Sequence, residues 1–240
     1  MVKRRDLVAG LAMAGIRSAG ADEQESLYIP KPQLVEDRAL LQDFMDEFSF
    51  VELVTCAPAI RITHIPVMLD RKTGKYGTLY GHISRQNPQC ATFAGQHPAV
   101  IVFRGPHSYI SPAWYAKTEA VPTWNFAVVH ASGKLKPISD EKALHDLLAK
   151  LVNKFENYEN STYDFSKLPE SYTRRMIGGI LGFEMEIEGL EGKFKLGQDR
   201  DGADREGILR NLRSAKQSRS IHDLTASFYE RSKTPGQDVR

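Results

Sequence analysis

Short runs of β-branched and aromatic residues follow one another closely along this chain, and their spacing restricts the fold more than any other feature. They occupy residues 50–56, 60–69, 77–84, 98–104 and 124–138. A parallel pair of strands needs a crossover of a dozen or more residues, and the first two gaps are too short for one. The spacing therefore predicts a mainly β, α+β fold, in which an antiparallel barrel carries peripheral helices.

Helices and further strands are predicted around this barrel. Apolar residues recur at helical spacing within 33–48, and Ser139 before two acidic residues starts a helix that runs to about Phe155. Pro169 opens another helix toward Met176. Residues 70–76 predict a hairpin turn at Gly74. Alternation predicts a half-buried strand over 180–188, with 192–196 as a candidate partner strand.

Composition excludes several classes of protein. The 240 residues are 41% hydrophobic and 26% charged, which is typical of a globular protein with its own core. Cys56 and Cys90 are too few for a disulfide scaffold, and Cys56 is predicted to be a buried, inert thiol within a strand. No apolar run approaches the ~20 residues that span a bilayer. The chain has no nucleophile elbow, phosphate-binding loop or dinucleotide motif.

Histidines supply one hypothesis. His64, His82, His107 and His130 lie on or beside predicted strands, where they could converge, although no local pair has metal-ligand spacing. A haem or metal site is therefore an alternative, and hydrogen-bonded structural histidines are the more common outcome.

Three polar and aromatic runs are better candidates for a site. In the first, residues 81–88, a strand ends at Arg85 and a short helix starts with Asn87 as its cap, an arrangement suited to phosphate. The other two are residues 103–115 and 121–126. Their aromatic side chains must pack on the barrel, on a second subunit or on a planar ligand, and rings beside an amide suit a planar heterocycle.

These runs resemble the PaiB-like family of FMN-binding negative transcriptional regulators, a branch of the split-barrel flavoproteins. The matching stretches are residues 28–31, 64–66, 81–88, 105–115, 121–125 and 191–198. The resemblance implies a six-stranded antiparallel split barrel that forms a homodimer, with FMN in grooves between the subunits. FMN is therefore the expected cofactor, and no metal is expected.

The resemblance also assigns roles. Backbone around Arg61, Thr63 and His64 would follow the flavin ring edge, and the segment from His82 to Asn87 would reach the phosphate through Arg85. Residues 124–125 and the 193–200 run would close the site, the latter from the same or the partner subunit. The full set of expected cofactor-binding residues is Arg61, Thr63, His64, His82, Ile83, Arg85, Asn87, Tyr109, Ser111, Trp124, Asn125, Lys195 and Gln198.

Three positions depart from the family pattern. Phe194 stands where tryptophan is common, and Gly197 and Asp199 stand where serine and asparagine are common. Losing a hydroxyl and gaining a carboxylate near a phosphate would weaken anion binding.

The two ends of the chain differ from its middle. Residues 1–26 resemble a twin-arginine export leader, with Arg4 and Arg5 before an apolar stretch and a small-residue triplet at 19–21. Export to the periplasm is expected, with a cytoplasmic location as the alternative. Residues 27–204 are the predicted flavin domain, and 205–240 a basic helical tail with eight Lys or Arg against four Asp or Glu.

Function is predicted as flavin-dependent redox chemistry or flavin binding. No residue is placed as an acid or base, so any chemistry would be the flavin's. The alternatives are a haem-binding or haem-degrading split barrel, and a cytoplasmic transcriptional regulator. The net charge of +2 and the lack of a helix-turn-helix signature or basic stripe disfavour nucleic acid as a partner.

Overall fold

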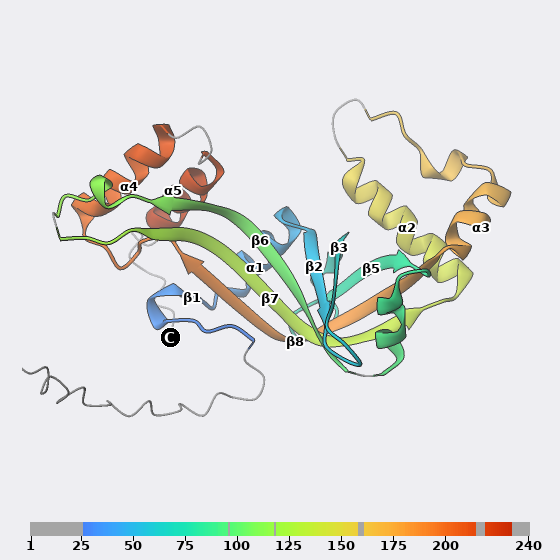
Figure 1. Ribbon diagram of the computed structural model, residues 1–240. Coiled ribbons are helices and arrows are strands. Elements are labelled where there is room, and N and C mark those ends of the chain that lie inside the picture. The colour runs from blue at the N-terminus through green and yellow to red at the C-terminus, as the bar shows by residue number, and fades with distance from the viewer. Residues whose placement is uncertain (1–25, 96, 118, 158–160, 215–218, 232–240) are drawn as a thin grey trace, which may run out of the picture.

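A computed structural model describes residues 26–95, 97–117, 119–157, 161–214 and 219–231. These residues form one antiparallel sheet in the order β3-β2-β6-β7-β8-β5-β4, with β1 added beside β8. The sheet curls into a half-barrel (Figure 1), which confirms the antiparallel split barrel. The strands are β1 (Leu34–Val35), β2 (Phe50–Thr55), β3 (Arg61–Pro66), β4 (Met68–Asp70), β5 (Thr78–Ser84), β6 (Pro98–Ile110), β7 (Thr123–Ile138) and β8 (Ile180–Lys195).

The strand count corrects the expected six. Six long strands are present, but the described sheet also contains β1 and β4, which are only two and three residues long. The expected partner strand at 192–196 is not separate, because β8 runs unbroken to Lys195. It does so because β7 offers it pairing positions along nearly its whole length, with one irregularity between Ser132 and Gly133.

Side-chain caps set the first residue of α1 and of α2. Asp37 accepts from the backbone N–H groups of Ala39 and Leu40, so α1 (Arg38–Glu47) is shorter than the predicted 33–48 segment. Residues ahead of it form the 3-10 helix η1 (Lys31–Gln33) and β1. Asp140 caps α2 (Glu141–Phe155), one residue later than predicted, and Pro169 precedes α3 (Glu170–Gly178).

The core lies between α1 and the inner face of the curled sheet. Leu41, Phe44 and Met45 of α1 are buried, and the Phe44 and Phe194 rings lie 5.0 Å apart between centroids. A Cβ atom on Gly192 would lie 2.3 Å from Cδ2 of Leu41, so only glycine lets α1 approach β8 this closely. The apolar face of α1 therefore fills the inside of the half-barrel, and the predicted flavin site must lie outside this core.

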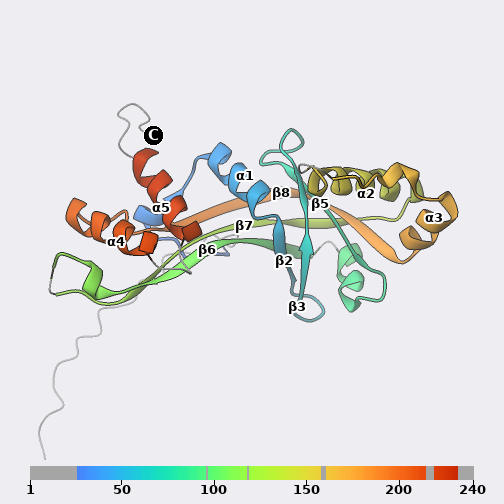
Figure 2. The ribbon, with the colours of Figure 1, turned by 90° about the horizontal axis from the view of Figure 1, so that it is seen from above.

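Two pairs of helices lie at opposite ends of the sheet (Figures 1 and 2). The α2–α3 pair occupies one end, and α4 (Gly202–Ser214) and α5 (Arg219–Arg231) occupy the other. Ile208, Leu212 and Ile221 are buried in the same apolar cluster as the barrel. Among the described residues, no helix has the length and apolar character needed to cross a bilayer. The expected leader lies outside the described residues, apart from Ser26.

Candidate functional site

The turn after β5 meets β3 in a cluster of expected site residues. Asn87 Nδ2 donates a 2.8 Å hydrogen bond to the hydroxyl of Thr63. Arg85 is exposed, its backbone N–H donates to Gly179 O, and its guanidinium has no ion-pair partner among the described residues. Arg61, Thr63, Arg85 and Asn87 are called the turn cluster below. In the turn cluster, the exposed guanidinium of Arg85 belongs to a turn that is hydrogen-bonded to β3.

The 3-10 helix η2 (Pro88–Gly95) closes this cluster, and one of its residues was missed by sequence reasoning. Gln89 is fully buried, and its backbone N–H donates a 2.9 Å hydrogen bond to Oδ1 of Asn87. Its side chain reaches both β2 and β3. Nothing in the local sequence pattern distinguishes this glutamine from an exposed one.

His82 and Ile83 point to opposite faces of β5. Ile83 is buried in the barrel core. His82 lies on the other face, where its Nδ1 is buried without a hydrogen-bond partner among the described residues. Burial lowers the pKa of His82 below its ordinary value of 6.5, because a charged imidazolium is poorly solvated there. Of the expected phosphate segment, only Arg85 and Asn87 belong to the turn cluster.

A second group of expected residues lies on the outer face of β6 and β7. The rings of Tyr109 and Trp124 meet edge to face with centroids 6.1 Å apart, and His107 lies 5.9 Å from Trp124. Trp124 is 51% exposed. These three residues are called the aromatic cluster below. Two of them, His107 and Trp124, line a hollow of about 260 Å³ together with Arg104, Gly105, Phe126 and Val128.

The remaining expected residues make local contacts near the aromatic cluster. Lys195 Nζ donates to the Thr123 hydroxyl at 2.5 Å. Ser111 caps the 3-10 helix η3 (Pro112–Trp114), and Gln198 accepts from Leu196 N at 2.7 Å. Asn125 faces the inner side of β7 and is 1% exposed, because neighbouring strand residues point to opposite faces.

The two clusters lie far apart within one chain. Arg61 pairs with Thr55, which pairs with Ala99, which pairs with Gly133 of β7. Trp124 is nine residues from Gly133 on the same strand, which corresponds to ~30 Å along β7. One small ligand in contact with Arg61 therefore cannot also touch Trp124 of the same chain.

A row of mostly ionisable residues also crosses the outer face, and sequence reasoning identified only its histidines. Cα pairing places His64, Glu52, Val102, His130 and Glu191 side by side across five strands. Glu52 binds the Arg104 guanidinium and lies 3.9 Å from His64 Nδ1. Burial lowers the pKa of His130, although the nearby carboxylate of Glu191 opposes the shift.

The segment before η1 is attached to the end of this row. The Ser26 hydroxyl lies 2.9 Å from His130 Nδ1 and donates to Glu191 at 2.6 Å. The backbone N–H groups of Ser26 and Leu27 also donate to Glu191. His64 and His130 thus share one row, whereas His82 and His107 lie elsewhere. No group of three His, Cys, Asp or Glu residues in the described ranges is arranged to hold a metal ion.

The three departures from the family pattern have structural explanations. Phe194 is fully buried between Phe44 and Phe228 and does not face either cluster. Gly197 has φ +77°, a conformation that favours glycine. Asp199 is exposed. Cys56 is also exposed, just beyond the last residue of β2, so the prediction of a buried strand thiol was wrong.

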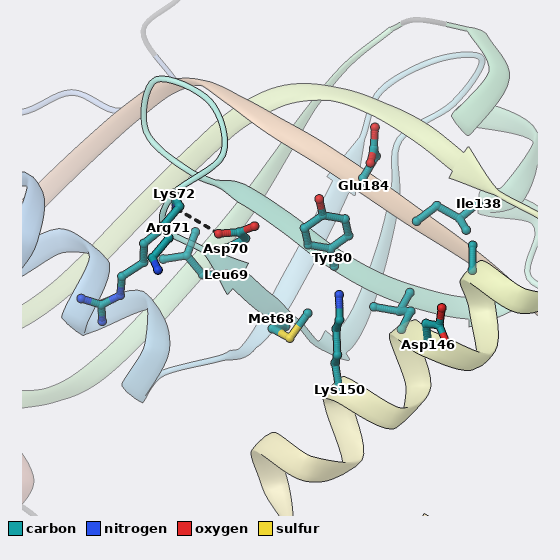
Figure 3. Close-up of a pocket in the computed structure, with 12 residues that line it drawn as sticks. Met68, Leu69, Asp70, Arg71, Lys72, Tyr80, Ile138, Asp146, Lys150 and Glu184 are labelled. Carbon is teal, nitrogen blue, oxygen red and sulfur yellow. Dashed lines mark hydrogen bonds between the residues drawn. The ribbon is translucent and has the colours of Figure 1, made fainter. Parts of the chain in front are cut away.

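A cavity of about 800 Å³ lies apart from the expected site, between α2 and the β4–β5 hairpin. Lys150 extends from α2 toward Tyr80, and Glu184 and Asp70 lie around the same ring (Figure 3). None of the thirteen expected residues lines this cavity. The cavity and the expected flavin residues are therefore separate features.

Comparisons with known proteins bear on the expected flavin site. A family model described as "Putative FMN-binding domain" matches residues 27–189. The protein named "Protease synthase and sporulation protein PAI 2" from Bacillus subtilis is 32% identical over 189 residues, which are 78% of this chain and 90% of the relative.

Two solved structures share the fold. The FAD and haem binding protein from Mycobacterium smegmatis has a TM-score of 0.52 at 18% identity, over 74% of this chain and 80% of that one. The flavocytochrome Anf3 from Azotobacter vinelandii has a TM-score of 0.51 at 15% identity, over 71% and 70% of the two chains. At these identities the similarity shows the fold alone.

Proposed function

The chain belongs to the PaiB-like, FMN-binding family of split-barrel proteins, and from this membership we propose that it holds the phosphate of FMN at the turn cluster. The exposed guanidinium of Arg85, which has no ion-pair partner within the described ranges, is the observation that carries the proposal. A guanidinium offers a planar set of donors that matches phosphate oxygens. Asn87, held by Thr63, fixes the same turn to β3, along whose backbone the flavin ring would lie.

We further propose that the complete site is formed by two copies of the chain. The ~30 Å along β7 between the rows of Arg61 and Trp124 prevents a single chain from placing both residues against one ligand. The outer face also carries large exposed apolar side chains, among them Phe50 and Ile62 at 69% and 57% exposure and Trp124 at the far end. β3 is an edge strand of the sheet, so a second copy that covers this face and reaches past that edge would bring its aromatic cluster to the turn cluster of the first.

The proposed activity is flavin-dependent oxidoreduction or flavin carriage. Bound FMN supplies hydride and electron transfer, and this chain's residues would bind and orient it. Haem is the second candidate because His64 and His130 share the outer face. FMN is favoured because His130 already bonds Ser26, whereas Arg85 is available to a phosphate.

The visible spectrum of the purified protein tests this assignment. A flavin spectrum with FMN released on denaturation supports the proposal, and a Soret band supports haem. A colourless protein that does not bind added FMN would reject the proposal.

We also propose that residues 1–26 direct twin-arginine export, on the basis of Arg4 and Arg5. These residues, except Ser26, lie outside the described ranges. Fusing 1–26 to a reporter of translocation tests the proposal, with Arg4→Lys/Arg5→Lys as the control. Equal translocation of both fusions would contradict it and favour the cytoplasmic alternative.

A further inference from the structure

Gln89 has the most fully satisfied polar side chain near the proposed flavin site. It is 0% exposed, and the two hydrogens of its Nε2 are shared among three acceptors, Leu53 O at 3.1 Å, Thr55 Oγ1 at 3.1 Å and Arg61 O at 3.3 Å. Its Oε1 accepts from the Thr63 hydroxyl. The side chain of Gln89 thereby bonds β2 and β3, and its backbone N–H bonds Asn87 just before η2.

The single hydrogen of the Thr63 hydroxyl determines which groups donate and which accept in these bonds. The Thr63 hydroxyl has one hydrogen, which it donates to Gln89, so its oxygen is left to accept from Asn87 Nδ2. The Asn87 Oδ1 in turn accepts from Gln89 N. Gln89, Thr63 and Asn87 thus form a closed ring of hydrogen bonds, with two bonds between side chains and the third from the backbone N–H of Gln89.

This ring connects the two parts of the turn cluster that would contact different ends of FMN. Arg61 and Thr63 lie on β3, where the flavin ring edge is proposed, and Asn87 and Arg85 lie in the turn, where the phosphate is proposed. A ligand gains from both ends only if the two contacts are held at a separation that fits it.

We infer that Gln89 is a positioning residue that sets the distance between β3 and the phosphate turn, and thereby selects phosphorylated flavin over riboflavin. The inference rests on the proposed function. Gln89 is buried and does not touch the ligand. Without its side chain, the Thr63 hydroxyl and the Arg61 carbonyl each lose one partner. The hydroxyl that accepts from Asn87 is then no longer held in one orientation, so the turn that carries Arg85 is held less firmly against β3.

The test compares FMN and riboflavin affinities of the full-length protein and its variants. Gln89→Met keeps the approximate volume of the side chain and removes its four side-chain hydrogen bonds, while the backbone bond to Asn87 stays. It should reduce the FMN-to-riboflavin affinity ratio by about tenfold or more, because the phosphate contact is charge-assisted. Thr63→Val, which removes the shared hydroxyl, should have a similar effect, and the double variant should lose little more than either single one.

Thr92→Val is the matched control. Thr92 lies on the same η2 helix, is 3% exposed, and its hydroxyl donates only to Gln89 O within that helix. The variant should lower thermal stability and leave the affinity ratio unchanged. This separates loss of stability from loss of positioning.

The affinity ratios separate failure of the Gln89 inference from failure of the proposed FMN site. A wild-type ratio in Gln89→Met would overturn the inference and leave the FMN assignment intact. If Gln89→Met does not fold, an unchanged ratio in Thr63→Val overturns it equally. If the wild-type protein binds no FMN, or binds FMN and riboflavin equally, the proposed phosphate site itself fails and the inference fails with it.

Discussion

The side-chain amide of Asn87 donates a 2.8 Å hydrogen bond to the hydroxyl of Thr63, across 24 residues of sequence. This contact joins the turn after β5 to β3, which are not hydrogen-bonded neighbours in the sheet. It exists because the sheet curls far enough to bring β3 near β5, with η2 beside them. The proposed phosphate and ring contacts therefore lie together because of the curl.

Replacement of Arg85 tests the phosphate contact directly. Arg85→Ala should weaken FMN binding by roughly ten- to a hundredfold and change riboflavin binding little, because only FMN carries the charge that the guanidinium would bind. Flavin fluorescence titration measures both affinities. Lys75→Ala removes the same charge at the β4–β5 hairpin and is the control. An equal loss for both flavins in Arg85→Ala would contradict phosphate binding.

A mixing experiment tests the two-copy site. Arg85→Ala and Trp124→Ala should each bind FMN weakly, since one lacks the phosphate contact and the other part of the aromatic cluster. Refolding or co-expressing the two variants together should restore about one site in four, because mixed dimers contain one site built from intact clusters. Measured FMN occupancy that stays at the level of the separate variants would mean that both clusters act within one chain, or that no dimer forms.

Acid should destabilise the ligand-free protein through its buried histidines. Burial lowers the pKa of His82 and His130 below 6.5, so the unfolded chain binds more protons than the folded one as the pH falls from 6.5. Stability should be fully present above that pH and decrease toward about pH 5. Urea unfolding at a series of pH values measures the slope.

His82→Gln identifies the source of this slope, because it removes a titrating group whose Nδ1 has no partner among the described residues. The variant should show a smaller loss of stability between pH 6.5 and about 5. His97→Gln, at an exposed position, is the control. A slope identical to that of the wild type in His82→Gln would rule out a contribution from His82.

The C-terminal helices should contribute to the stability of the barrel. Ile221 of α5 is 0% exposed within the barrel's apolar cluster, so Ile221→Ala should lower the free energy of unfolding by about 2–4 kcal/mol. Ser227→Ala changes an exposed position on the same helix and should leave stability nearly unchanged. Chemical denaturation measures both. Equal stability of the two variants would indicate that α5 is not packed on the core in solution.

Local patterns predicted most of the strands, because alternation and chain-breaking residues act over a few neighbours. The hairpin at Gly74 is an example, since its φ of +81° needs a residue without a Cβ atom. The start of α2 was predicted to within one residue for the same reason, since Asp140 caps it. The start of α1 lies later than the apolar spacing predicted, because the cap Asp37 sets it.

The composition of the candidate site could also be predicted, but its assembly could not. Arg85, Asn87, Thr63 and Trp124 stand in runs whose chemistry is visible in the sequence. Which of them meet depends on pairing between strands distant in sequence. Gln89 was missed because its burial results from the approach of β2 and β3, and Asn125 is separated from Trp124 because adjacent strand residues face opposite sides.

The sequence by itself determined an antiparallel, mainly β chain of the FMN-binding family, since periodicity, capping residues and motifs are properties of short segments. Only the tertiary structure decided that the turn cluster and the aromatic cluster lie at opposite ends of the long strands. Strand length and register set that separation, and both depend on how β6, β7 and β8 pair over their whole length.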